Sequence, residues 1–446
     1  MWLVRWLGHQ SRVIPIVYLA AIATGTALLM LPAANTSQRS PALIDAAFTA
    51  TSAICITGLT TVDTQNFWSP FGQVVIMALI QLGGFGIVTV ASYLTLLATG
   101  RISLHSSLLA SQELHQSNLT DTFRLPARIA AVMFGAEAVF AAVLTVSFRP
   151  HTDSWGTAGW YGIFHAVSAF NNAGFALFSD NLIGFVGEPG IIVPLCLATV
   201  LGGIGFPVLF ELTRRGHRRR ASHWSVHTRM TIYGTLILLG TGFVAFALFE
   251  WNNPATLGSM PLGDRLLASL AGTVFPRTSG FNSIDYGVAS ESTLGLTYVL
   301  MFVGGGSAGT AGGIKVGTLG IVLATVLAEL RGEEQVTIAH RGIPRGVQRS
   351  AIAIILLGGL AVSVATLFIV ADSRFSLQQA LFETISAFGT VGLSTGITAQ
   401  LRPESLIVLM ILMYLGRVGT ISVATALAVR GWHRRYRLPE EHPIVG

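Results

Sequence analysis

Four glycines, each at the end of a short apolar segment, are the positions where this sequence can do chemistry. The segments read TATSAICITGL, HAVSAFNNAGF, AGTVFPRTSGF and ETISAFGTVGL, and they place Gly58, Gly174, Gly280 and Gly392 at spacings of 116, 106 and 112 residues. Glycine permits the backbone angles that hold successive carbonyls on one side of the chain. Carbonyl oxygens without helical partners are costly inside a membrane, so the pattern indicates a desolvated monovalent cation as their ligand.

A second glycine-rich landmark follows each segment by 24 to 29 residues. The landmarks are QLGGFGIVT (Gly83, Gly84), LGGIGFPVL (Gly202, Gly203), GGGSAGTAGGIK (Gly304 to Gly313) and LGRVGTISV (Gly416). Two landmarks that recur four times in register predict four internal repeats. For Gly83, Gly84, Gly202 and Gly203, close packing between helices is the alternative interpretation.

The elements that must position these landmarks lie in a membrane. The 446 residues are 52% hydrophobic and 11% charged, with a mean hydropathy of +0.64. This composition excludes a soluble enzyme, a nucleic-acid binder and a disordered scaffold. Eight apolar runs are long enough to span a bilayer, near 12–33, 69–99, 126–148, 190–213, 229–250, 293–330, 349–371 and 404–430.

Four shorter apolar segments lie between the members of each consecutive pair of runs. They fall near 42–54, 159–171, 264–276 and 376–389, are too short to cross a bilayer, and are expected to be re-entrant. Ser40-Pro41, Asp264 and Ser376 are the expected N-caps of the first, third and fourth of these helices. The partial negative charge at the other end of each helix would then point at the polar loop, which suits a cation.

The distribution of arginine predicts the orientation. Segments 1–12, 101–128, 211–229, 331–349 and 430–446 hold 19 arginines, and the segments on the other side hold five. This positive-inside pattern places both termini in the cytoplasm and accounts for most of the net charge of +6. The outer side is acidic, which indicates either a cation-concentrating vestibule or ordinary solvated loops. The RRGHRRR cluster at 214–220 is first a topology signal and second a candidate contact with membrane lipids.

The runs GGGSAGTAGGIK, MYLGRVGT and SAICITGL resemble the superfamily of potassium transporters that includes KtrB, TrkH and the plant HKT proteins. The resemblance covers essentially the whole chain, and the KtrB branch fits better because the first repeat begins near residue 12. It implies four helix, pore-helix, filter-loop, helix repeats in a pseudo-fourfold arrangement around one pore, with eight spanning helices and four re-entrant half-helices. It also implies a homodimer in the bacterial inner membrane, a cytosolic ring of KtrA-type regulatory subunits that alone bind nucleotide, K+ as substrate and Na+ as an activator.

The resemblance also assigns residues to the filter and the gate. K+ would bind carbonyls of Gly58, Gly174, Gly280 and Gly392. The filter residues carried over are Ile54, Cys55, Ile56, Thr57, Gly58, Asn171, Asn172, Ala173, Gly174, Arg277, Thr278, Ser279, Gly280, Gly389, Thr390, Val391 and Gly392. The gate residues are Gly304, Gly305, Gly306, Ser307, Gly309, Thr310, Gly312, Gly313, Lys315 and Arg417. Because the 304–313 stretch contains six glycines, we expect it to be an intramembrane loop and not a rigid helix.

The predicted repeats occupy residues 1–100, 101–216, 217–333 and 334–430, and residues 431–446 form a cytoplasmic tail. Their filter loops lie near 54–58, 171–174, 277–280 and 389–392, and the gate loop at 304–313 belongs to the third repeat. Only one glycine is shared among the four filter loops, so the filter is expected to be less regular than that of a tetrameric potassium channel.

Several single residues have two interpretations. Arg417, midway through a span, is expected to act in the permeation barrier and to pair with the gate; a structural ion pair with Glu137 is the alternative. Lys315 would contact the same cavity or a cluster of carbonyls. Arg277 is expected to orient the third filter loop by donating to its carbonyls. Asn171 and Asn172 would either offer side-chain oxygens to the ion or brace their loop.

The sequence therefore predicts a subunit for passive, channel-like permeation of K+, gated by a cytosolic partner. A Na+-permeable or weakly selective transporter and an alternating-access secondary transporter are the alternatives. The chain is not expected to be an enzyme. Its G-x-G-x-x-G and G-x-S-x-G spacings within 304–309 have membrane-helix flanks and no strand before them.

Overall fold

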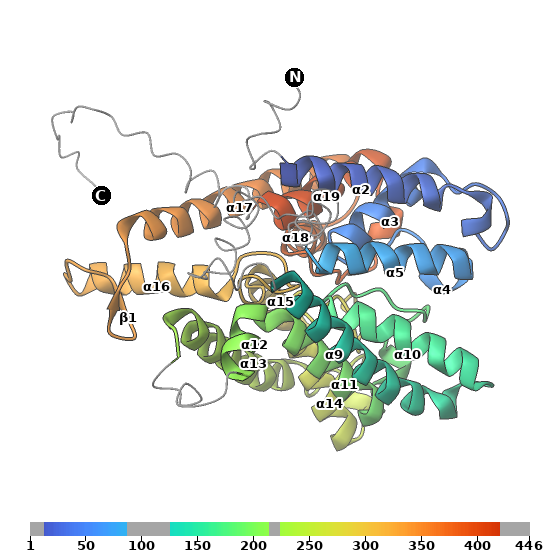
Figure 1. The fold of residues 1–446 in the computed structure, drawn as a ribbon, viewed down its shortest axis with the longest axis horizontal. Coiled ribbons are helices and arrows are strands. Elements are labelled where there is room, and N and C mark those ends of the chain that lie inside the picture. Colours follow the sequence, from blue (N-terminus) through green and yellow to red (C-terminus); the bar gives the residue numbers. More distant parts are fainter. Residues whose placement is uncertain (1–12, 87–124, 214–223, 420–446) are drawn as a thin grey trace.

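The computed structural model describes residues 13–86, 125–213 and 224–419. The part of the chain that it describes is mostly helical, and its strands are the two-residue pair β1 (Thr337–Ile338) and β2 (Arg341–Gly342). This hairpin joins α16 (Val316–Leu330) to α17 (Arg345–Asp372), which project side by side from the body of the molecule (Figure 1). The predicted boundary near residue 100, the RRGHRRR cluster and the tail after 430 lie outside the described residues.

The four short apolar segments predicted from the sequence are all helices. They are α3 (Leu43–Ile54), α10 (Trp155–Phe170), α14 (Leu262–Val274) and α18 (Leu377–Gly389). Side-chain caps begin two of them. Ser154 Oγ accepts from the Thr157 N–H before α10, and Ser376 forms a capping box with Gln379 before α18.

Of the three caps predicted from the sequence, Ser376 is confirmed, and those at Ser40-Pro41 and Asp264 were wrong. The N-cap residues of α3 and α14 are Ala42 and Pro261, and neither provides a side-chain hydrogen bond. Asp264 lies inside the first turn of α14, where its negative charge still interacts favourably with the partial positive charge at that end of the helix.

Three helices are long and apolar enough to cross a membrane: α9 (Leu125–Phe148), α13 (Val226–Glu250) and α17. A fourth span results if α11 (Pro189–Ile204) and α12 (Phe206–Thr213) are taken together, although they meet at an angle of 97°. By length and composition, the described part of the chain therefore holds three or four spans. Exposed apolar side chains such as Val139, Leu248 and Leu356 on the long helices fit a lipid-facing surface.

Two of the runs predicted to span are broken. Run 190–213 bends at Gly205, whose φ of 102° interrupts the helix. Run 293–330 is divided into α15 (Glu291–Phe302) and α16 by a non-helical stretch from 303 to 315. The remaining runs give α2 (Val13–Leu29), α5 (Pro70–Gly84) and α19 (Pro403–Tyr414), which continues into a π-helical turn at Leu415–Gly419.

The connections contain short helical turns. These are η2 (Pro32–Ala34), α4 (Thr64–Phe67), η3 (Arg149–His151), η4 (Ile183–Phe185), η7 (Leu257–Ser259) and η8 (Thr398–Gln400).

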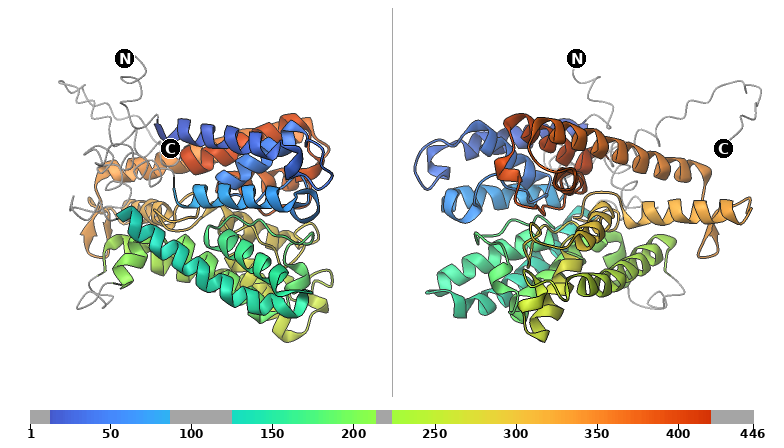
Figure 2. Two further views of the ribbon diagram at one scale, coloured as in Figure 1. Left: turned by 45° about the vertical axis from the view of Figure 1, so that its right-hand side comes forward. Right: turned by 180° about the vertical axis from the view of Figure 1, so that it is seen from behind.

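The two ends of the described chain lie in the same half of the molecule. Helices α2, α3 and α5 lie with α17 to α19, and α9 to α14 form the other half (Figures 1 and 2). Tyr414 Oη, at the end of α19, donates to Pro15 O in α2 at 2.9 Å. The contacts also close a cycle, because α5 packs on α10, α11 on α14, α15 on α18 and α19 on α3. Helices α10, α14 and α18 therefore each pack against a helix that precedes them in the chain, and the contact of α19 with α3 closes the cycle.

Candidate ion-conducting site

The four loops that follow the short helices share one backbone conformation. All four landmark glycines have positive φ, at 93°, 69°, 74° and 98° in chain order. The residue two positions earlier is also left-handed in every loop, although none of these four is glycine: Ile56 (51°), Asn172 (57°), Thr278 (76°) and Thr390 (49°). Non-glycine residues adopt this conformation only rarely, so its fourfold recurrence shows that the loops are built alike. The sequence analysis missed this second position because the residue types there are unrelated.

The loops also contact one another in a closed order. A Cβ added to Gly58 would overlap the carbonyl oxygen of Ala173, and one on Gly174 would overlap that of Ser279. The same collision relates Gly280 to Val391 O and Gly392 to Thr57 O. Each glycine therefore leaves room for the carbonyl that precedes the glycine of the next loop. Glycine is therefore required at these positions for two reasons: its φ is positive, and a side chain would collide with the carbonyl of the next loop.

A serine six residues before the glycine supports three of the loops. Ser52 Oγ accepts from Gly58 N at 3.0 Å, Ser386 Oγ accepts from Gly392 N at 3.1 Å, and Ser168 Oγ donates to Phe175 O at 2.8 Å. The third loop has Val274 at this position, and its Gly280 N–H instead bonds to Phe275 O at 3.3 Å. The third loop is therefore held differently from the others.

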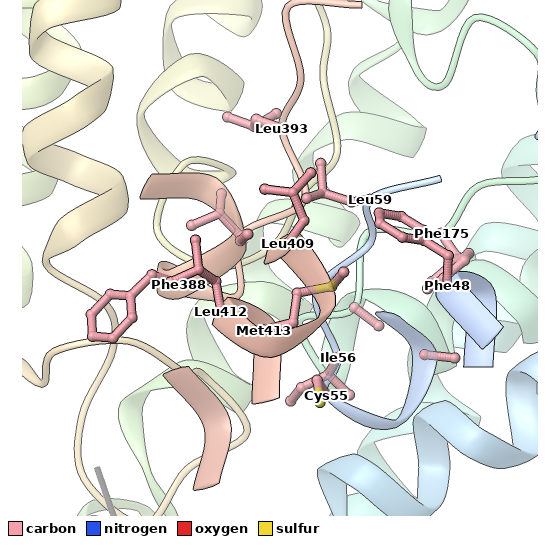
Figure 3. Packing of buried hydrophobic residues seen from close by; sticks show 14 of the residues in the cluster. Phe48, Cys55, Ile56, Leu59, Phe175, Phe388, Leu393, Leu409, Leu412 and Met413 are labelled. Atoms are coloured by element: carbon pink, nitrogen blue, oxygen red, sulfur yellow. The ribbon is translucent and has the colours of Figure 1, made fainter. Parts of the chain in front are cut away.

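The apolar side chains of the first and fourth loops pack into the protein. Cys55, Ile56 and Leu59 of the first loop, Phe388 at the end of α18 and Leu393 of the fourth loop belong to one buried cluster with Leu409, Leu412 and Met413 of α19, around which they lie in Figure 3. All of them are buried. What these loops can offer an ion is therefore their backbone and not these side chains.

Asn171 and Asn172 make contacts that brace the second loop. Asn171 Nδ2 donates to Glu137 Oε1 (2.9 Å), Gln81 Oε1 (3.1 Å) and Val167 O (2.9 Å). The amide of Asn172 hydrogen-bonds to Thr310 Oγ1 at 3.0 Å. These contacts favour bracing over ion contact for both residues.

We predicted that Arg277 donates to the carbonyls of its own loop, but its side chain bonds elsewhere. Its Nη2 donates weakly to Gly304 O (3.3 Å) and to Thr235 Oγ1 (3.4 Å). The side chain therefore links the end of α14 to the first glycine of the 304–313 stretch. Arg277 and Gly304 are 27 residues apart in the sequence, so the sequence alone did not indicate this contact.

The 304–313 stretch is non-helical, as expected, and is held across the break between α11 and α12. Gly306 N donates to Gly203 O (2.8 Å), Thr310 N donates to Gly202 O (3.1 Å), and Phe206 N donates to Ala308 O (3.1 Å). Added Cβ atoms on Gly305 and Gly306 would overlap the carbonyls of Gly203 and Ile204. The glycines let two chain segments meet backbone to backbone.

Arg417 bonds to this stretch from the π-helical turn after α19. Nη1 donates to Thr310 O at 2.6 Å, and Nη2 donates to Gly83 O at 2.7 Å. Thr310 Oγ1 in turn donates to Phe170 O at 3.0 Å, where α10 ends. The alternative of an Arg417–Glu137 ion pair is wrong, because Glu137 instead accepts from Gln81 and Asn171.

Lys315 lies at the other end of the stretch and contacts a cluster of carbonyls. Its Nζ donates to Ala311 O and to Gly312 O, the latter at 3.2 Å. These contacts support the interpretation of this lysine as the partner of a carbonyl cluster.

The glycines of the long helices have a packing role. Added Cβ atoms on Gly83, Gly202 and Gly416 would overlap the carbonyls of Ile54, Phe170 and Phe388. Those three residues lie four positions before their loop glycines, at the ends of α3, α10 and α18. This contact supports the helix-packing interpretation of Gly83 and Gly202.

In the segment between the first loop and α5, the carboxylate of Asp63 makes structural hydrogen bonds. Asp63 accepts from Ser179 Oγ (2.6 Å), Asn66 Nδ2 (2.7 Å) and Gln65 N (2.9 Å). Partial burial opposes ionisation, but these hydrogen bonds prevail and hold the pKa of Asp63 below its ordinary value. Its negative charge therefore joins the segment after the first loop to the segment after the second.

Comparison with known proteins places this arrangement in a family. Residues 10–432 match the family model TrkH, described as a cation transport protein. The chain belongs to the TrkH family. A solved relative in fold is the potassium transporter TrkH from Vibrio parahaemolyticus, with a TM-score of 0.72 at 16% identity over 96% of this chain and 86% of that one.

Three curated TrkH-family relatives match over nearly their full lengths. The Ktr system potassium uptake protein B of Bacillus subtilis is 38% identical (95% of this chain, 94% of the relative), and that of Vibrio alginolyticus is 35% identical (98% and 95%). The potassium/sodium uptake protein NtpJ of Enterococcus hirae is 34% identical (98% of each chain). Membership of this family confirms the predictions of a multi-pass membrane transport protein that is not an enzyme.

Proposed function

We propose that this chain is the ion-conducting subunit of a potassium uptake system, with four repeats arranged pseudo-fourfold around a single pore. The observation that carries the proposal is the closed order of contacts among the four loops, in which each glycine meets a carbonyl of the next loop. Four loops with the same backbone conformation that meet in a cycle surround one axis. Fourfold repetition also favours a pore over an alternating-access transporter built from two repeats.

The loops supply what a partly dehydrated K+ requires. Backbone carbonyls replace the hydration shell of the ion, and the C-terminal ends of α3, α10, α14 and α18 add partial negative charge. The residues before the four glycines differ: Thr57, Ala173, Ser279 and Val391. A ring built from four different residues is less regular than one built from four copies, so we expect weaker discrimination between K+ and Na+. The potassium/sodium relative of Enterococcus hirae makes a Na+-permeable transporter the second candidate.

The 304–313 stretch is the proposed gate. It crosses from α15 to α16, bonds to Gly202 and Gly203, and is held by Arg417. Permeation requires it to move aside, and a positively charged Arg417 beside it raises the barrier to a cation. The flow of K+ would then be passive and controlled by the position of this loop.

The proposed partners follow from the relatives and the positive-inside pattern. "Ktr system" in the names of two relatives supports a system of several subunits, which fits a KtrA-type ring that carries the nucleotide. The projecting α16 and α17 are a candidate attachment for it (Figure 2). A homodimer, activation by Na+, contact with membrane lipids, and cytoplasmic termini in the bacterial inner membrane complete the proposal.

Growth of a bacterium that lacks its own potassium uptake systems tests this function. Expression of the chain, with and without a regulatory partner, should restore growth at low K+. Failure in every combination, despite normal amounts in the membrane, would refute the potassium assignment. Gly58→Ser should abolish selective uptake because its side chain would collide with Ala173 O; unaltered selectivity would show that the first loop is not part of the filter.

A further inference from the structure

Two buried polar side chains, His165 and Glu383, have no place in the filter or the gate proposed above. Each lies in a short helix nine residues before its loop glycine, His165 before Gly174 in α10 and Glu383 before Gly392 in α18. Both side chains are fully buried. A polar group in such a position must find partners, because an unpaired one is costly in a membrane protein interior.

Glu383 reaches from its helix to the chain segment that leaves the fourth loop. Oε1 accepts from Ser394 Oγ at 2.5 Å and from Thr395 N at 3.2 Å. Oε2 accepts from Thr398 Oγ1 at 2.8 Å. One carboxylate therefore fixes residues two to six positions beyond Gly392.

His165 makes the equivalent contact in the second loop. Its Nε2 lies 3.2 Å from Leu177 N, and since that backbone group can only donate, Nε2 carries no proton. Nδ1 is then the protonated nitrogen and donates to Tyr161 O at 2.7 Å. The ring also stacks on Phe178 at 4.9 Å and on Phe281, which follows Gly280, at 6.2 Å.

The two contacts share a register. Leu177 and Thr395 each lie three residues after their loop glycine. If positions are counted from the loop glycine, each contact joins the side chain at position −9 to the backbone N–H at position +3, and we call this contact the brace. The other two loops lack the brace. Position −9 is Ala271 in the third, and in the first it is Thr49, whose hydroxyl has no hydrogen-bond partner among the described residues.

The order of contacts among the loops gives this alternation a meaning. Because the first loop meets the second, the second the third, the third the fourth and the fourth the first, the braced loops lie opposite each other. One diagonal of the ring is therefore braced through the segments that leave its two loops, and the other diagonal lacks this brace.

We propose that His165 and Glu383 are positioning residues that fix the spacing of the ring across this diagonal and so determine discrimination between K+ and the smaller Na+. This inference rests on the proposed function. Neither side chain touches the ion. Each holds the outgoing segment of its loop, and without it the N–H at position +3, buried in the second loop and part-buried in the fourth, loses its partner and the segment relaxes. The carbonyls remain, so selectivity should fall while conduction persists.

Uptake of K+ and Na+ by the full chain in the membrane of a transport-deficient bacterium tests the proposal. Glu383→Leu and His165→Leu remove the acceptor for the N–H at position +3 and should lower the K+/Na+ uptake ratio by about tenfold, the equivalent of losing that one hydrogen bond. Glu383→Leu also loses the bonds from Ser394 and Thr398 and should have at least as large an effect. Glu383→Gln and His165→Gln keep an acceptor near the same place and should keep the ratio within about twofold of the original. Thr49→Val is the matched control at the unbraced position and should leave the ratio unchanged.

Ser394→Ala keeps the proposal testable if the leucine variants fail to fold. It removes one donor to Glu383 at a half-buried site and should lower the ratio by a smaller factor, with K+ uptake retained. The brace is refuted if the unmodified chain is selective and none of the leucine and alanine variants lowers the ratio, or if Thr49→Val lowers it equally. A chain that moves no K+ in any form would instead refute the proposed function.

Discussion

Replacing Arg417 with Ala tests the gate directly, because this buried side chain holds the 304–313 stretch to another part of the chain. Its guanidinium donates to Thr310 O at 2.6 Å and to Gly83 O at 2.7 Å. Hydrogen bonds to charged groups contribute about 1.5–3 kcal/mol each, so the loss of both weakens the attachment by about 3–6 kcal/mol. Water that reaches the freed carbonyls recovers part of this amount.

The expected consequence is a higher resting flux. At the lower bound of about 3 kcal/mol, the balance between attached and detached loop shifts by about 100-fold. Loss of the positive charge lowers the barrier to a cation in the same direction. Since flux saturates once the loop is mostly detached, we expect uptake without a regulatory partner to rise by about tenfold or more. Tracer uptake of rubidium into vesicles that contain the purified chain measures it.

Two further variants control this experiment. Arg402→Ala removes an arginine from the start of the same helix, where it pairs with Asp372 at 3.4 Å and is 70% exposed. Such surface pairs contribute little, so the flux should not change. Arg417→Lys keeps the charge but cannot reach both carbonyls with one ammonium group, and should give an intermediate flux.

Unchanged flux in Arg417→Ala, at equal abundance in the membrane, would refute a role in the barrier. If that variant does not accumulate, Arg417→Lys decides the question, because it leaves the charge in place and removes only the second contact.

Three other predictions concern the loops and the gate. Gly174→Ala should abolish uptake, because the φ of 69° at Gly174 and its contact with the next loop exclude a side chain. Gly159→Ala is the control, since nothing lies close to an added Cβ there, and it should transport normally; equal activity of the two variants would contradict the loop packing. Thr310→Val removes the hydroxyl that donates to Phe170 O and should raise resting flux by about fivefold to tenfold, measured by rubidium uptake. A flux equal to that of the original chain would show that this hydrogen bond does not hold the 304–313 stretch in place. Cys55 is buried behind the first loop, so a charged thiol reagent should neither label it in the folded protein nor inhibit uptake; inhibition that Cys55→Ser abolishes would place this side chain in the pore.

The positions of the elements were largely predictable from the sequence. Runs of about twenty apolar residues and runs of a dozen differ in what a bilayer allows, and all four short segments are helices. The four glycines were also recognisable, because each recurs at the same place after a short apolar segment. The left-handed residues at Ile56, Asn172, Thr278 and Thr390 were not, since no common side chain marks them.

Contacts of single charged residues were harder to predict. Arg417 was correctly associated with the glycine-rich stretch as a candidate, but its second partner, Gly83, lies 334 residues away in the chain. Arg277 was expected to bond within its own loop and instead reaches Gly304. A long side chain can reach many backbone carbonyls, and the choice among them depends on which segments the fold brings together.

The sequence by itself determined membrane residence, the fourfold recurrence and the glycines at which a side chain is forbidden. These properties are local, because they depend on the length and apolarity of a segment or on the φ of one residue. Only the tertiary structure decided the cyclic order of the loops, the breaks at Gly205 and after Phe302, and the bonds of Arg417, His165 and Glu383. Those features arise from distant segments packed backbone to backbone, and such contacts leave no spacing in the sequence to reveal them.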